Sequence, residues 1–139
     1  MFSKVNLTST VVTTLWGFFG GFLLWGILAD PYLMSHIGAL NLTPPEEPNF
    51  TFLFLGCLFV GLFFSTIYSK LATSSHNAPL GAKFGILIGL LIGFGNGFID
   101  YSTAGILDLN GTIVNGFIYV VHFLIMGVLA SLVYKKFDS

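Results

Sequence analysis

Four long stretches, almost free of charged side chains, constrain this chain more than any other feature of its sequence. They run from about Val11 to Ala29, Phe50 to Tyr68, Leu80 to Ile99 and Thr112 to Tyr134. Lys83, near the start of the third stretch, carries the one formal charge within them. A helix crosses a bilayer in about 20 apolar residues, whereas membrane barrels use shorter, alternating segments. We therefore expect an all-α membrane protein, with four transmembrane helices in a single domain that spans residues 1–139.

The composition excludes several other classes of protein. Only 8% of the residues are charged, against about 25% in soluble domains, so neither a water-soluble globule nor a disordered chain is expected. Five basic residues spread along the chain cannot form a phosphate-binding stripe, so we expect no nucleic-acid partner. The single cysteine excludes an internal disulfide and a thiolate zinc cluster.

The charged residues separate by the side of the membrane on which they fall. All five basic residues are lysines on one predicted side: Lys4, Lys70, Lys83, Lys135 and Lys136. Five of the six acidic residues fall on the other side, and Asp138 is the exception: Asp30, Glu46, Glu47, Asp100 and Asp108. The positive-inside rule then predicts that both termini are cytoplasmic. The first apolar run is too long for a cleaved signal peptide, so we expect it to remain.

The three connections differ in character. Residues 30–49 form the longest predicted loop, and Pro44-Pro45-Glu46-Glu47-Pro48 suggests a stiff, extended entry to the second span. Residues 69–79 form a polar linker on the lysine side. Residues 100–111 form a short loop, in which Asn110-Gly111 predicts a turn.

The second and fourth spans share the pattern G-x-x-x-S-x-x-Y-x-K when one is shifted by 66 positions. Gly61, Ser65, Tyr68 and Lys70 then fall on Gly127, Ser131, Tyr134 and Lys136. The first and third spans align less well at a shift of 70, with Asp30 on Asp100. We interpret this as a tandem repeat of two helical hairpins, residues 1–70 and 71–139, related by an axis along the membrane normal. Chance recurrence of small and interfacial residues is the alternative.

Small residues recur at a spacing of four along the spans. The third span carries the longest series: Gly81, Gly85, Gly89, Gly93 and Gly97. Shorter pairs occur in the other spans: Gly17 with Gly21, Gly61 with Ser65, and Gly127 with Ser131. Such a glycine zipper lets helices approach closely, either within one bundle or between copies. A pore-lining or sliding helix is the other interpretation.

Polar side chains within the fourth span indicate a candidate site. Asn115, Tyr119 and His122 share one helix face, and an ionisable residue inside a membrane is by default a functional candidate. Asn96 and Asp100 share a face of the third span, and Asp30 ends the first. Together these six residues could form a polar pathway. Alternatively, His122 is a neutral side chain that bonds to a neighbouring hydroxyl or carbonyl, such as the hydroxyl of Tyr119 or of a serine on a neighbouring span.

Catalytic and cofactor-binding motifs are absent from the sequence. It lacks H-E-x-x-H, G-x-S-x-G and a Walker loop. His36 and His76 fall in loops on opposite sides, so His122 has no intramembrane partner with which to bind haem. We therefore expect no enzymatic activity, no metal and no bound cofactor.

The layout resembles a family of small four-helix bacterial membrane proteins of unknown function. The similarity rests on the segment from Gly21 to Met34, the glycine-rich third span and the central His122 of the fourth. The basic residue typical of the family after its first helix is missing here. The resemblance implies a bacterial inner-membrane location and carries no activity with it.

Two functions fit this sequence. The first is a non-catalytic membrane protein that works by helix association, as a homo-oligomer or as an accessory subunit of a larger membrane complex. The second is a small channel or transporter, proton-linked in one version, with a pathway through His122. Replacing His122 with Leu separates them, since only a transporter would lose a flux.

Overall fold

The computed structural model is all-helical and describes residues 3–38, 48–73 and 75–138. Four helical spans are long and apolar enough to cross a membrane, as the sequence predicts: Lys4–Met34, Phe50–Leu71, Ala78–Thr103 and Leu109–Phe137. The first consists of α1 (Lys4–Leu15), the π-helical segments η1 (Trp16–Gly20) and η2 (Phe22–Ala29), and α2 (Asp30–Met34). The second is α3 (Phe50–Leu71), the third joins α4 (Ala78–Leu90), η3 (Leu91–Asn96) and α5 (Gly97–Thr103), and the fourth is α6 (Leu109–Asp138). The predicted extended entry at residues 44–47 lies outside the described residues.

Four helices start at a side chain that accepts a hydrogen bond from the backbone amide three residues later. Ser3, Asn49, Asn77 and Asp108 do so over 3.2, 3.3, 2.9 and 2.8 Å, respectively. Such N-caps satisfy an amide that has no partner within the helix. The cap at Asp108 corrects the turn predicted at Asn110-Gly111, because both residues lie in the first turn of α6. The chain uses Gly105 instead, which has a φ of 58°.

The first span starts earlier than the predicted Val11. α1 begins at Lys4, although the segment from there to Leu15 is rich in Ser and Thr. Five polar residues of this segment form one face that is buried in the bundle: Asn6, Ser9, Thr10, Thr13 and Thr14. The polar face is therefore part of the interior of the bundle.

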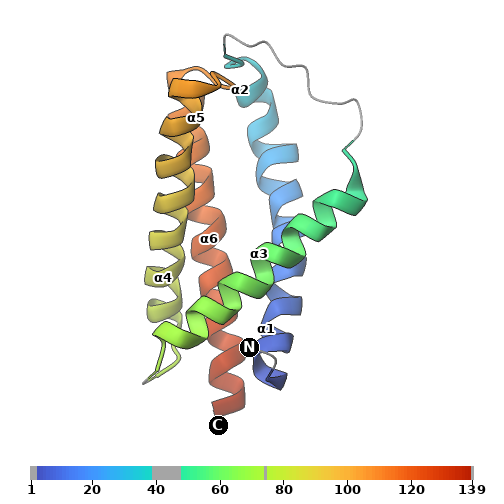
Figure 1. The fold of residues 1–139 in the computed structure, drawn as a ribbon, viewed down its shortest axis with the longest axis vertical. Coiled ribbons are helices and arrows are strands. Elements are labelled where there is room, and N and C mark those ends of the chain that lie inside the picture. Colours follow the sequence, from blue (N-terminus) through green and yellow to red (C-terminus); the bar gives the residue numbers. More distant parts are fainter. Residues whose placement is uncertain (1–2, 39–47, 74, 139) are drawn as a thin grey trace.

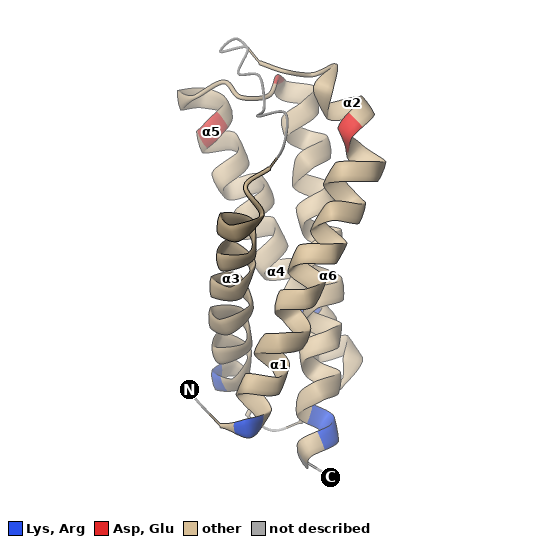
Figure 2. Cartoon of the chain, turned by 90° about the vertical axis from the view of Figure 1, so that its right-hand side faces the viewer, with Lys and Arg blue, Asp and Glu red and all other residues tan. Residues whose placement is uncertain are grey.

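The helices pack as two pairs whose geometries differ. α4 and α6 run side by side, and α3 crosses the bundle on a diagonal, with its second half against α1 (Figure 1). Both termini lie at the same end of the bundle (Figure 1). The lysine residues lie toward that end, which we call the lysine end (Figure 2). Asp30, Asp100 and Asp108 lie toward the opposite, aspartate end, and Asp138, the last residue of α6, is the exception. The charge separation expected from the sequence is thus present along the bundle axis.

A clasp at the aspartate end joins the first span to the start of α6. Ile37 and Leu107 form an isolated antiparallel bridge, and the amide of Asp108 donates to the carbonyl of His36 over 2.9 Å. The Asp108 carboxylate also lies 2.7 Å from Nδ1 of His36. The hydrogen bond from the amide of Gly111, and then that from His36, hold the pKa of Asp108 below its ordinary value.

We expect acid to release this cap. Because the folded pKa of Asp108 is depressed, its contribution to stability is present above its ordinary pKa and is lost as the pH falls through the lowered folded value, below about pH 4. Amide exchange of Gly111, corrected for its intrinsic pH dependence, should lose protection there. The amide of Leu80 is the matched control, because its cap, Asn77, does not titrate. Equal loss at both amides would contradict this account.

Candidate functional site

The predicted polar face of α6 meets the first span at Trp25. Nε1 of Trp25 donates to Oδ1 of Asn115 over 2.7 Å. The indole ring lies 4.7 Å from the ring of Tyr119 and 5.2 Å from that of His122, centroid to centroid. Asn115, Tyr119 and His122 are therefore gathered around one side chain of η2, as their shared helix face predicts.

His122 is enclosed by aromatic rings. It is 5% exposed and stacks on Trp16 at 5.7 Å, while Nε1 of Trp16 donates to the backbone carbonyl of His122 over 2.9 Å. Among the described residues, the buried Nδ1 of His122 has no hydrogen-bond partner. The expected bond to Tyr119 or to a neighbouring hydroxyl is thus not made at this atom. Burying an imidazole nitrogen without a partner is costly in an apolar interior.

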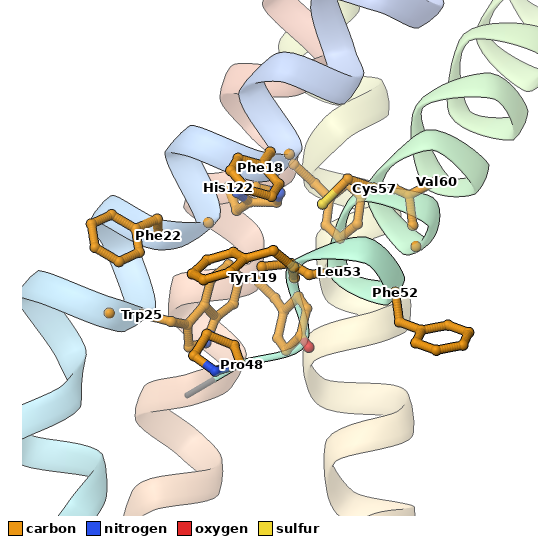
Figure 3. A pocket seen from close by; sticks show the side chains of 16 residues that line it. Phe18, Phe22, Trp25, Pro48, Phe52, Leu53, Cys57, Val60, Tyr119 and His122 are labelled. Atoms are coloured by element: carbon orange, nitrogen blue, oxygen red, sulfur yellow. The ribbon is translucent and has the colours of Figure 1, made fainter. Parts of the chain in front are cut away.

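A cavity of about 540 Å³ lies beside His122, between η1 and η2, the first half of α3, and α6. Figure 3 shows the side chains that surround it. The walls are mostly aromatic residues and glycines, and the polar groups among them include His122, Tyr119, Trp25 and Cys57. Phe22 and Phe52 line the cavity and are 56% and 72% exposed. The cavity therefore reaches the outer surface of the bundle.

The other predicted pathway residues lie elsewhere. Asn96, Asp100 and Asp30 are exposed, and none of them lines the cavity. Asn96 lies one residue before Gly97, yet its side chain is exposed and not enclosed by the bundle. The six candidate residues thus divide into three that surround Trp25 and three at the surface.

The glycines of the third span meet the backbone of α6. A Cβ added at Gly81 or Gly85 would collide with the carbonyl oxygen of Gly127 or Phe123, and one at Gly89 would lie 2.6 Å from Cα of Val120. A Cβ at Gly93 would lie 2.6 Å from the carbonyl oxygen of Gly116. A Cβ at Gly97 would lie 3.6 Å from Cγ2 of Thr112, an ordinary van der Waals contact. These glycines therefore pack within one chain.

The small-residue pairs of the other spans differ in their surroundings. Gly61 and Ser65 face α1: a Cβ at Gly61 would lie 2.5 Å from Oγ1 of Thr14, and Oγ of Ser65 bonds to Oγ of Ser9 over 2.9 Å. Gly127 and Ser131 face Gly81 of α4. A Cβ at Gly17 would lie 3.5 Å from Cβ of Cys57, whereas at Gly21 it would meet nothing within 4 Å.

A buried polar cluster near the lysine end was missed by the sequence reasoning. Nδ2 of Asn6 donates to the hydroxyl of Tyr134 over 3.1 Å, and the hydroxyl of Tyr134 donates to the carbonyl of Ser65 over 3.2 Å. Oγ1 of Thr13 lies 3.2 Å from Oγ of Ser65. These bonds connect α1, α3 and α6. The sequence could have indicated this cluster, because the polar residues at 6, 9, 10, 13 and 14 have the spacing of one helix face.

The first half of α3 has little packing. Every residue from Phe50 to Val60 is exposed except Cys57, which is half-buried, and the buried residues of α3 begin at Gly61. Its ring contacts to the first span pass through Phe18, which lies 6.3 Å from Phe50 and 6.2 Å from Phe54.

Comparisons of the chain with protein-family models, with curated proteins and with solved structures gave no match.

Proposed function

We propose that this protein is a non-catalytic integral membrane protein that works by helix association, as a homo-oligomer or as an accessory subunit of a larger membrane complex. The observation that carries the proposal is the exposed first half of α3. Helices associate in lipid through close packing contacts, and this half-helix makes few of them within its own chain.

One face of α3 presents exposed aromatic side chains against which a partner helix could pack. Phe59 and Phe63 are 60% and 49% exposed, and their rings stack at 6.2 Å, centroid to centroid. Exposed aromatic side chains on one helix face can pack against a second helix. The glycines of α4, by contrast, already meet α6, so α3 is the better candidate for an external partner.

The setting of this function is part of the proposal. We place the lysine end, with both termini, in the cytoplasm by the positive-inside rule, and the chain in a bacterial inner membrane. We also propose that the chain arose by duplication of a hairpin. The supporting geometry is that Gly61 and Ser65 face α1 while Gly127 and Ser131 face α4, and that the π-helical segments η2 and η3 overlap at the shift of 70.

The test is native mass spectrometry of the untagged protein, gently extracted from its own membrane. We expect a stable assembly with copies of itself or with other chains, and we expect Phe59→Ala with Phe63→Ala to weaken it at least tenfold. Leu87→Ala with Leu91→Ala is the matched control, because these leucines are 65% and 66% exposed on another span. A wild-type protein that remains monomeric would contradict the proposal.

A small channel or transporter, proton-linked in one version, is the second candidate. The observation that favours it is a set of three buried polar atoms without a partner among the described residues: Oδ1 of Asn6, Oγ1 of Thr14 and Nδ1 of His122. Water could satisfy such atoms and join them into a route. The His122→Leu flux comparison separates this function from association.

A further inference from the structure

We infer that the cavity beside His122 binds a neutral, membrane-soluble molecule with a flat ring and a ring oxygen, of the quinone class, and that the oxygen bonds to the imidazole of His122. This binding function goes beyond helix association and does not depend on it. It also differs from the expectation, based on the sequence, that no cofactor is bound.

The depth of the cavity requires a neutral ligand. His122 lies 13 residues after Leu109 and 15 before Phe137, the ends of the fourth span, which places it about 20 Å along the helix from either end at 1.5 Å per residue. A charged group at the middle of a bilayer is costly. A phospholipid head group would therefore remain near the surface, whereas an uncharged ring can reach this depth.

The unpartnered imidazole requires a hydrogen-bonding atom on the ligand. A neutral imidazole has one donor and one acceptor nitrogen. Among the described residues Nδ1 of His122 has no hydrogen-bond partner, and the side chain of His122 lines the cavity. A carbonyl oxygen on the ligand would accept the N–H of the imidazole, so a plain hydrocarbon chain would not satisfy the site.

The walls favour a flat ring. Phe18, Phe22, Trp25 and Tyr119 line the cavity, and aromatic side chains stack in offset or edge-on geometry on a planar group. Gly21 and Gly56 also line it, with nothing within 4 Å of either Cβ position, which leaves open space beside the aromatic walls. The volume of about 540 Å³ lies within the ordinary range for a small-molecule site. The exposed Phe22 and Phe52 at its edge allow entry from the lipid.

The two tryptophans of the chain make this site directly observable. Trp16 and Trp25 are the only two, and both contact His122. Quinones quench indole fluorescence at short range. The experiment titrates decyl-substituted benzoquinone into the full-length protein in lipid nanodiscs and follows intrinsic fluorescence. We expect quenching that saturates, on top of the linear quenching caused by quinone dissolved in the bilayer.

Four variants separate the cavity from the bilayer. Gly56→Leu fills the open space and should weaken the apparent affinity at least tenfold, whereas Gly95→Leu, on the exposed side of η3, should leave it unchanged. His122→Leu should weaken the affinity about tenfold, the value of one hydrogen bond of about 1.4 kcal/mol. His122→Gln, which keeps a donor and an acceptor, should recover part of it.

Three results would overturn the proposal. Linear quenching in the wild type means that the cavity takes water or lipid only. Saturable quenching that Gly56→Leu leaves intact places the quinone elsewhere. Unchanged affinity in His122→Leu removes the hydrogen bond on which the choice of ligand rests. Circular dichroism of each variant identifies loss of fold, and none of these results depends on whether the protein forms assemblies.

Discussion

Replacing Gly85 with Leu should strongly destabilise the four-helix bundle. A Cβ at this position would collide with the carbonyl oxygen of Phe123 and lie 2.8 Å from Cα of Leu124. Both are backbone atoms of α6, which cannot yield as a flexible side chain does. The two helices would have to separate, and the neighbouring contacts at Gly81 and Gly89 would be lost with them. We expect a loss of at least about 3 kcal/mol in the free energy of unfolding.

The matched control is Gly95→Leu on the same span. The nearest side-chain atom to a Cβ at Gly95 is Cδ1 of Leu91 at 4.0 Å, so the added side chain would extend away from the bundle. Unfolding of both variants in mixed detergent micelles, followed by circular dichroism, gives the comparison. Similar unfolding midpoints for the two would show that the glycines of α4 do not set the approach of α6.

The second large effect is a new covalent bond between the first span and α3. In Gly17→Cys the added Cβ would lie 3.5 Å from Cβ of Cys57, within the range of disulfide bonds. Because the chain has one native cysteine, a membrane-permeant oxidant should convert nearly all of this variant into an internally cross-linked form. Loss of labelling by a maleimide-polyethylene glycol reagent measures the reaction on a gel.

Gly21→Cys, one turn further along the same span, is the control for proximity. Nothing lies within 4 Å of its Cβ position, so it should keep both thiols open to the reagent under the same oxidation. Cross-linking of both variants to the same extent would indicate a first half of α3 that moves freely against the first span. Labelling of both would place Cys57 away from Gly17 altogether.

The number and approximate limits of the spans could be predicted because hydropathy alone determines them. The start of the first span could not, since hydropathy treats Ser9 and Thr13 as polar residues to be kept in water. In the bundle both are fully buried and bond across helices, so their cost in lipid is offset by partners that the sequence does not show. The regular spacing of these residues was the available signal.

The candidate site was only partly predictable, for a related reason. Asn115, Tyr119 and His122 belong to one helix, and a fixed helical geometry brings them to one face. Asn96 belongs to another helix, whose rotation about its axis is set by its packing. The glycine series indicated which side of that span packs closely, but it did not indicate whether the partner would be α6 or another copy, or that Asn96 would be exposed. The cavity depends on the crossing angle of α3, which no local pattern encodes.

The one-sided anchoring of α3 has a mechanical consequence. The 22 residues of α3 form a helix about 33 Å long. Its buried residues begin at Gly61, so the first half of the helix can tilt about a point near that glycine. In the proposed membrane setting, the thickness of the bilayer would act on this half-helix, because a span tilts until its apolar length matches the hydrocarbon. A thinner membrane would increase the tilt of this half-helix and a thicker membrane would decrease it, and few contacts within the chain would be lost. The disulfide between Gly17→Cys and Cys57 would hold the first half of α3 at a single tilt.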